Sequence, residues 1–307
     1  MTDAPPPQAQ VLTSGYYGWD EQAARDLLAA ADLPAGSLQR LVGGTNAVWK
    51  LNGTPWVLRV AGPDVSEATL SWQLAAAGAL SGAGVRFASP ARLAPLVLDG
   101  PAGTVRATLW TAVKQSGEPG YGHFGAAVRT LHDLGRAALD GAGVALSSAL
   151  DVAHLGAKLA SGSRAGWAGP AEVALLGPWV ERVQAGLEPF RHLDVAVVHD
   201  DLWIKNACGP AAVLCDPDNL GSGPAVYDLA FVTRGLESGS VSTAQAAAFV
   251  RGYGADLPAL DDAWALALAH RLRWVVLLME RRSWHPSASA TLAVELPLWA
   301  RPRGPRP

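Results

Sequence analysis

The sequence predicts an α+β protein with two unequal lobes, in which an antiparallel sheet with a helix precedes a larger, mainly helical part. The chain has 307 residues, more than one compact hydrophobic core usually contains. Short apolar runs separated by glycine and asparagine turns occur before Thr111, whereas from Phe124 onward the apolar residues recur mostly at helical spacing. We therefore expect an N-terminal lobe of residues 1–112 and a C-terminal lobe of residues 113–307.

The N-terminal lobe is predicted to contain two helices and a small sheet. Ala and Leu recur at helical spacing in residues 20–31, which carry acidic residues early. Asp64-Val65-Ser66-Glu67 resembles a capping box, so a second helix should run from there to Leu80. The expected strands are residues 38–42, 47–51, 56–60, 92–98 and 104–110. Asn52-Gly53 between two of them is a strong hairpin signal.

Composition argues against several classes of function. The chain is 50% hydrophobic and 17% charged, as expected for a soluble globular protein. Its net charge is −3, and the 24 basic residues are scattered, which argues against nucleic acid as a partner. No secretory signal or membrane-spanning run is recognisable, so we expect a cytoplasmic protein with a small-molecule partner. The sequence does not define the oligomeric state.

The two cysteines, Cys208 and Cys215, flank a Gly-Pro turn in a predicted hairpin. A disulfide across the hairpin is geometrically conceivable, but two cysteines in a cytosolic chain are more often reduced. Two thiols alone would also make a poor zinc site.

The segment with the most chemical information contains His199, Asp201 and Asn206, followed by Asp216 and Asp218. An apolar run at residues 195–198 would lead into it, a run at 211–214 would return, and Gly209-Pro210 would turn between them. Asp201, Asn206 and Asp216 should therefore converge on one point. Phosphoryl transfer requires mainly a positioned nucleophile and neutralised phosphate charge. A carboxylate facing a hydroxyl and hard oxygen ligands for Mg²⁺ would meet both needs.

The pattern His-x-Asp-x4-Asn followed by Asp is similar to the catalytic and metal-binding loops of the aminoglycoside phosphotransferase and choline kinase family, distant relatives of protein kinases. Two further features extend the resemblance: Pro224-Ala225-Val226-Tyr227-Asp228-Leu229-Ala230 and, in a preceding helix, Leu131-His132. The resemblance implies a two-lobed protein-kinase-like fold, ATP and Mg²⁺ as cofactors, and a small hydroxylated acceptor. The acceptor could be an amino alcohol, an amino acid, a sugar or an aminoglycoside. Asp228 would anchor structure behind the site.

The resemblance also implies a role for each residue of the motif. Asp201 would be the catalytic base, and His199 would brace the loop through hydrogen bonds. Asn206 and Asp216 would be the Mg²⁺ ligands, and Asp218 would assist the metal or its water shell.

In the N-terminal lobe the resemblance assigns nucleotide contacts with two departures from the family pattern. Gly43-Gly44-Thr45-Asn46 would cover the phosphates with backbone N–H groups, although Gly43 and Gly44 alone would more often form a hairpin turn. Arg59 stands where kinases commonly have a strand lysine, and it could instead be a surface residue that reaches solvent. Gln73 stands where a helix glutamate usually pairs with that cation. The nucleotide would bind near the hinge at Thr111 and Val113.

A third departure is Asp200, which occupies a position where the family often has glycine. This carboxylate could turn outward, raise the pKa of a neighbouring acid through like-charge repulsion, or contact a cationic substrate.

The acceptor site is expected among the C-terminal helices. The candidate residues are Asp261, Asp262, Trp264, His270, Arg271, Arg273, Trp274, Glu280 and Arg281. Helical spacing places His270, Trp274 and Arg281 within range of one face.

Two functional hypotheses follow. The first is an ATP-dependent kinase that phosphorylates a hydroxyl group of a small molecule. The second is a nucleotide-binding regulator of the same fold with weak catalysis, suggested by Arg59 and Gln73 in place of the usual ion pair. The presence of Asp201, Asn206 and Asp216 favours the enzyme, because a binding module does not need the base.

Overall fold

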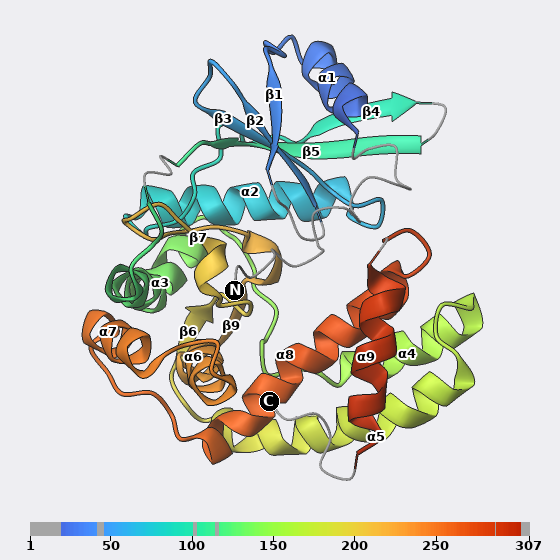
Figure 1. Ribbon diagram of the computed structural model, residues 1–307, viewed down its shortest axis with the longest axis vertical. Coiled ribbons are helices and arrows are strands. Elements are labelled where there is room, and N and C mark those ends of the chain that lie inside the picture. Colours follow the sequence, from blue (N-terminus) through green and yellow to red (C-terminus); the bar gives the residue numbers. More distant parts are fainter. Residues whose placement is uncertain (1–19, 42–45, 101–102, 114–116, 286, 302–307) are drawn as a thin grey trace, which may run out of the picture.

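The computed structural model of the chain describes residues 20–41, 46–100, 103–113, 117–285 and 287–301, with the backbone alone for residues 260–263. A twisted sheet and the helix α1 (Glu21–Ala30) form the upper lobe in Figure 1, the helix α2 (Glu67–Gly82) lies beneath the sheet, and the helices that follow in the chain form the larger lower lobe. This is the two-lobed α+β arrangement that the sequence predicts.

The upper lobe contains a five-stranded antiparallel sheet with the strand order β1-β2-β3-β5-β4. The strands are β1 (Leu38–Leu41), β2 (Ala47–Leu51), β3 (Trp56–Val60), β4 (Leu96–Gly100) and β5 (Gly103–Thr111). The prediction of residues 92–98 as a strand is wrong at its start, because Pro95 has no N–H for a strand ladder and Leu93 points to solvent with 69% exposure. Strands β2 and β3 have the predicted limits.

Two helices pack against the sheet, and both begin at a side-chain cap. In α1 (Glu21–Ala30), Asp20 accepts a hydrogen bond from the Ala23 backbone N–H at 2.7 Å. In α2, Ser66 accepts one from the Thr69 N–H at 3.1 Å. The expected cap at Asp64 is therefore two residues too early.

Two clusters of buried apolar residues stabilise the molecule. One lies between α1 and the sheet, and includes Leu27, Leu28 and Leu58. The other joins Leu74 and Leu80 of α2 to the helices of the lower lobe. Because α2 belongs to this second cluster, an apolar contact connects the two lobes in addition to the chain itself.

The lower lobe is helical apart from two short strand pairs. Its helices are α3 (Tyr121–Gly141), α4 (His154–Ala165), α5 (Pro170–Leu187), α6 (Val226–Ser238), α7 (Thr243–Tyr253), α8 (Leu260–Arg281) and α9 (Ala288–Trp299). β6 (Val195–Val198) pairs with β9 (Gly221–Pro224), and β7 (Ala207–Cys208) pairs with β8 (Val213–Leu214). The return strand is thus shorter than predicted and pairs with β7.

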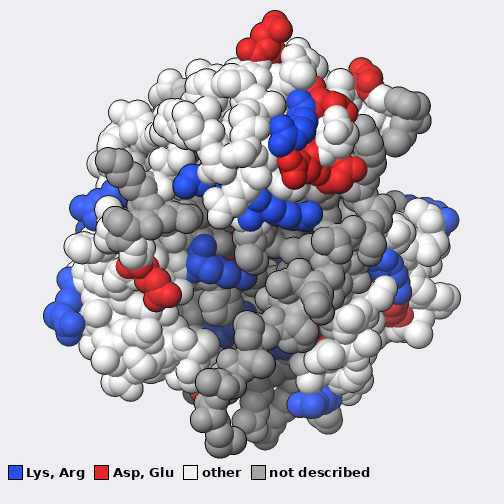
Figure 2. Space-filling model, turned by 45° about the horizontal axis from the view of Figure 1, so that its top comes forward, with Lys and Arg blue, Asp and Glu red and all other residues white. Residues whose placement is uncertain are grey.

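The surface supports the predicted charge distribution. On the face shown in Figure 2, Lys and Arg side chains stand in separate groups and form no continuous stripe among the described residues. Among the described helices, none combines the length and apolarity needed to cross a bilayer.

Helices α3 and α7 approach each other closely at Gly125. A Cβ at this position would lie 2.2 Å from the backbone oxygen of Phe249 and 2.9 Å from the backbone nitrogen of Tyr253. Gly125→Ala should therefore force the helices apart and lower the free energy of unfolding by roughly 1–3 kcal/mol.

Chemical denaturation of both variants and the parent measures this effect. Gly177 of α5 is the matched control, because a Cβ there meets no atom within 4 Å. Gly177→Ala should raise stability by about 0.5–1 kcal/mol through helix propensity. Equal stability of the two variants would contradict the close approach.

Candidate active site

The loop that follows β6 is fixed at its start by a fully buried carboxylate. The two oxygens of Asp228 on α6 accept hydrogen bonds from the backbone N–H groups of His199 at 2.7 Å and of Asp200 at 3.0 Å. His132 of α3 contacts the same carboxylate through Nε2 at 3.0 Å, and its Nδ1 lies 2.9 Å from the Tyr253 hydroxyl. One side chain therefore joins the loop to two helices.

His199 supports the loop and does not face the base candidate. Its Nε2 donates to the Cys215 carbonyl oxygen at 2.8 Å, since a carbonyl can only accept. The buried ring stacks on Phe87, with centroids 6.1 Å apart. These contacts tie the start of the loop to the residue that precedes Asp216.

Asp201 and Asn206 form one unit. The Asn206 amide donates to Asp201 Oδ2 at 3.0 Å and to the Asp201 carbonyl oxygen at 2.8 Å. Asn206 ends the short helix η4 (Ile204–Asn206), which turns the chain back toward Asp201. Because the Asn206 nitrogen is used as a donor, its carbonyl oxygen is left as the group for a cation.

Arg59 of β3 connects the upper lobe to the second pair of acids. Its Nη2 lies 2.9 Å from Asp216 Oδ1 and 2.5 Å from Asp218 Oδ2, and its Nη1 donates to Gln73 Oε1 at 3.3 Å. Arg59 is 9% exposed, so it is not a surface residue that reaches solvent. Gln73 accepts a hydrogen bond from Arg59 without carrying a charge, and the charge of Arg59 is balanced by Asp216 and Asp218.

Asp216 itself has φ +67°, a left-handed conformation that opens the turn η5 (Pro217–Asn219).

The electrostatics of this acid pair are strongly perturbed. Burial and the charge of Asp218 raise the pKa of Asp216 to about 7. Burial also opposes ionisation of Asp218, but the charge and hydrogen bond of Arg59 outweigh it and lower the pKa of Asp218. The two close carboxylates thus share the single positive charge of Arg59. The site can therefore accept a further positive charge.

The donor set fits a hard divalent cation. Asp218 Oδ1 is buried and has no hydrogen-bond partner in the described part of the chain. Among the described residues, no group of three or more His, Cys, Asp or Glu side chains is arranged to hold a metal ion by itself. Two carboxylates and an amide oxygen are nevertheless typical of Mg²⁺ sites that complete their shell with water and substrate phosphates.

The predicted nucleotide contacts lie partly outside the described residues. Gly43, Gly44 and Thr45 fall there, whereas Asn46 immediately precedes β2. Thr111 ends β5, and its backbone N–H donates a hydrogen bond to the Ser89 carbonyl oxygen at 2.9 Å. Val113 is half-buried and lies between β5 and the lower lobe.

Asp200 does not turn outward, which was one of the alternatives considered from the sequence. It is buried with φ +56°, and its Oδ2 accepts from Arg273 Nη1 at 2.6 Å. The same Arg273 nitrogen donates to the Tyr227 hydroxyl at 2.7 Å. Asp200 therefore turns inward and ties the loop to α8. Its left-handed conformation explains why glycine suits this position and why aspartate is tolerated.

Two members of the predicted acceptor set reach the loop, namely Arg273 and His270. His270 Nδ1 lies 2.9 Å from the Asp200 carbonyl oxygen, and its Nε2 lies 3.8 Å from Asp201 Oδ1. Phe231 of α6 packs against this ring at 4.7 Å between centroids.

The other members of the acceptor set have partners elsewhere. Arg271 pairs with Glu295, Glu280 with Lys158 and Arg281 with Asp64. Trp264 contacts Arg182, and Trp274 packs against the lower core. The side chains of Asp261 and Asp262 are not among those that the structure describes. Helix α8 thus presents its polar residues to several different partners along its length.

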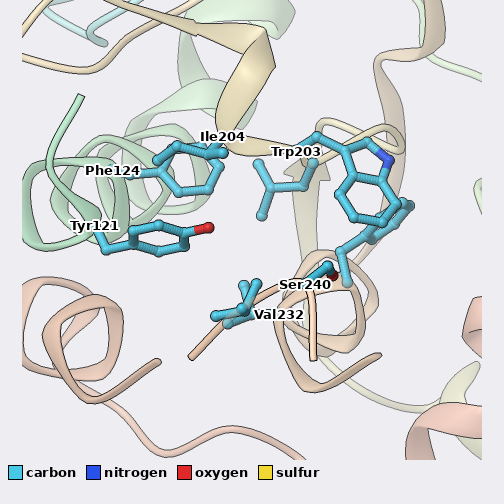
Figure 3. A pocket seen from close by; sticks show the side chains of 9 residues that line it. Tyr121, Phe124, Trp203, Ile204, Val232 and Ser240 are labelled. Atoms are coloured by element: carbon cyan, nitrogen blue, oxygen red, sulfur yellow. The ribbon is translucent and has the colours of Figure 1, made fainter. Parts of the chain in front are cut away.

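A small apolar pocket adjoins the loop that follows β6 (Figure 3). Trp203 and Ile204 form part of its wall, and the Tyr121 hydroxyl points toward its interior. The lining residues are Tyr121, Phe124, Leu202, Trp203, Ile204, Phe231, Val232, Ser240 and Val241. Because none of them is charged, the pocket offers no counter-charge to an ionic acceptor.

Two contacts near the site were not anticipated from the sequence. Asp64, expected as a helix cap, accepts from Arg281 Nε at 2.9 Å and so joins the upper lobe to the end of α8. The Arg234 guanidinium lies over the Trp203 ring at 5.0 Å, beside the catalytic loop. Helical spacing from Tyr227 and Phe231 would have placed Arg234 on the same face of α6. The Asp64 contact spans more than two hundred residues and has no local signal.

The two cysteines are free, and their sulfur atoms lie 3.6 Å apart across the β7–β8 hairpin. This agrees with the reduced state that the sequence favours.

Solved structures of kinases and antibiotic phosphotransferases share this fold. A microcompartment-associated aminopropanol kinase is 19% identical, with a TM-score of 0.58 over 94% of this chain and 99% of the relative. A choline/ethanolamine kinase family protein from Mesorhizobium loti is 18% identical, with a TM-score of 0.55 over 89% and 93% of the two chains. A spectinomycin phosphotransferase, solved with ADP and spectinomycin, is 12% identical, with a TM-score of 0.57 over 92% and 95%.

At these identities the structures establish the fold alone. No curated protein sequence matches the chain. The model of the phosphotransferase enzyme family matches residues 37–265, which include the sheet, the catalytic loop and the first turn of α8. The chain therefore belongs to the phosphotransferase enzyme family.

Proposed function

We propose that this phosphotransferase is an ATP- and Mg²⁺-dependent kinase that transfers the γ-phosphate to a hydroxyl group of a small molecule. The relatives are named for aminopropanol, choline or ethanolamine, and spectinomycin, so amino alcohols and aminoglycosides are the first acceptors to test, followed by amino acids and sugars. The nucleotide would lie between residues 1–112 and residues 113–307, close to Thr111 and Val113.

The observation that carries this proposal is the meeting of two acidic groups from different segments. Asp201 is held by Asn206 at 3.0 Å, while Asp216 and Asp218 are held by Arg59 of the upper lobe. In the proposed reaction Asp201 orients the acceptor hydroxyl and receives its proton. The new bond forms between the hydroxyl oxygen and the γ-phosphorus, and the bond from that phosphorus to the ADP oxygen breaks.

Asn206, Asp216 and Asp218 would hold Mg²⁺, which would neutralise charge on the phosphates. Arg59 would then share its N–H groups between these acids and the phosphate oxygens, since a guanidinium can serve several acceptors at once. His199 and Asp228 would keep the loop in place from behind.

An acceptor panel tests the proposal. ADP release is followed with Mg²⁺-ATP and, separately, amino alcohols, aminoglycosides, hydroxylated amino acids and sugars, and products are verified by mass spectrometry. A thermal shift with Mg²⁺-ADP reports nucleotide binding, because ligand at 100 times its dissociation constant stabilises by about 2.7 kcal/mol. No shift with any Mg²⁺-nucleotide would refute both the kinase and the weakly catalytic regulator. A shift without phosphorylation of any acceptor would favour the regulator.

The affinity for Mg²⁺ should rise with pH across the neutral range. The pKa of Asp216 is raised to about 7, so this carboxyl is largely protonated below that value and ionised above it. Mg²⁺ must displace the proton, and its affinity should therefore be about tenfold higher at pH 8 than at pH 6.

The measurement is a titration with Mg²⁺ alone, so that the nucleotide's own phosphates do not contribute to the pH dependence. Asp194→Asn, which changes an exposed acid away from the site, should keep the parent's dependence. Asp216→Asn should bind Mg²⁺ weakly at both pH values. An affinity that is flat with pH in the parent would show that Asp216 is not a ligand.

A further inference from the structure

The ring of His270 lies between the two aspartates of the catalytic loop. Its Nδ1 is 2.9 Å from the Asp200 carbonyl oxygen and therefore carries the proton of that hydrogen bond. In the neutral ring Nε2 then has no proton, and its lone pair is available. This atom lies 3.8 Å from Asp201 Oδ1, whereas Asn206 donates to the other oxygen, Oδ2.

Two carboxylates, those of Asp200 and Asp201, face the ring. Asp200 Oδ1 is buried without a hydrogen-bond partner among the described residues, and it lies 3.7 Å from His270 Nδ1. The other oxygen of Asp200 is neutralised by Arg273. A buried carboxylate oxygen without a donor is costly, and an imidazolium between Asp200 and Asp201 would compensate both.

The ring is also fixed in position. Phe231 packs edge-on against it at 4.7 Å between centroids, and 15% of the side chain remains exposed. The hydrogen bond from Nδ1 would by itself join α8 to the loop. That hydrogen bond does not explain why Nε2 faces Asp201. We therefore consider a separate role for Nε2.

We propose that His270 is a second catalytic residue, which takes up the proton that leaves the acceptor hydroxyl. This inference rests on the proposed kinase function. The hydroxyl oxygen bonds to the γ-phosphorus as the bond from phosphorus to the ADP oxygen breaks. The hydroxyl proton passes to Asp201 and from there to the lone pair of His270 Nε2. The products are the phosphorylated acceptor, ADP and an imidazolium, which later releases its proton to water.

Substitution of His270 by asparagine or by glutamine distinguishes the roles of the two ring nitrogens. In His270→Asn the amide can replace Nδ1 as the donor to Asp200, but nothing replaces Nε2. In His270→Gln the amide reaches the position of Nε2 but cannot act as a base at neutral pH. Both variants should lower kcat by about 10²-fold and leave the affinity for Mg²⁺-ADP unchanged. The matched control is His192→Asn, which alters an exposed histidine and should keep the parent's rate.

The rates are measured with the best acceptor from the panel and, in parallel, with water as the acceptor by ADP release from Mg²⁺-ATP. A His270→Asn variant within twofold of the parent overturns the proposal, because its donor to Asp200 is intact. If His270→Asn does not fold, the rate of His270→Ala is measured with and without added imidazole. Recovery of the rate with imidazole supports the proposal, and no recovery overturns it.

The pH dependence separates a catalytic role from a structural one. The charged and titratable groups around the ring are Asp200 and Asp201 on the loop, Arg273 on the same helix and, from α6, Tyr227, which binds Arg273. The pH profile of kcat in the parent should contain a step that is absent in His270→Asn. An unchanged profile in the variant overturns the proposal.

Failure of this inference can be distinguished from failure of the kinase function. If Asp201→Asn is inactive and His270→Asn is fully active, the kinase function stands and His270 has only a structural role. If the parent binds no Mg²⁺-nucleotide, the kinase function itself is refuted.

Discussion

Asp201→Asn should reduce kcat by about 10³-fold while Mg²⁺-ADP binds as tightly as in the parent. Asparagine has the size of aspartate but cannot accept a proton, and general-base catalysis typically contributes 10²–10⁴-fold. Arg59 pairs with Asp216 and Asp218, and this substitution changes neither of them, so the metal and nucleotide contacts should persist.

The measurement is a steady-state assay with an acceptor from the panel, combined with calorimetry for Mg²⁺-ADP. Asp140→Asn is the control, because this acid pairs with Arg136 on the exposed face of α3. It should leave both kcat and nucleotide affinity unchanged. If Asp201→Asn keeps the parent's kcat, another group is the base.

The parts of the fold that depend on local patterns could be predicted from the sequence. Strands β2, β3 and β6 have the predicted limits, because alternating or continuous apolar runs end at turn residues that the chain itself supplies. The spacing between Asp201 and Asn206 also determines their contact, since one turn of η4 brings the amide back to the carboxylate. β4 was misplaced because apolar residues before Pro95 resemble a strand although one of them, Leu93, faces solvent.

The parts of the site that depend on distant segments could not be predicted in this way. Asp200 and Arg273 are 73 residues apart, and Arg59 and Asp218 are 159 apart. Nothing in the local sequence shows which carboxylate will meet which cation after folding. The roles of His199, Asp201, Asn206, Asp216 and Asp218 remain predictions, although these residues do converge.

The second large effect is expected at Asp228, which holds the catalytic loop from behind. Asp228→Ala removes both acceptors of the His199 and Asp200 backbone N–H groups and the partner of His132. Each buried donor left without an acceptor costs about 1–3 kcal/mol, so stability should fall by roughly 2–6 kcal/mol. Catalysis should fall too, because the neighbouring Asp201 would lose its fixed position.

Asp228→Asn makes the test specific, since it keeps the volume of the side chain. Its amide offers one oxygen where two N–H groups need acceptors, and its NH₂ group would oppose one of them. The variant should therefore be destabilised as well, whereas Asp140→Asn should change stability by no more than about 0.5 kcal/mol. Denaturant unfolding and kcat are measured on the same samples. If Asp228→Asn is as stable and active as the parent, the loop is held by His199 and Cys215 instead, and the buried carboxylate is not its anchor.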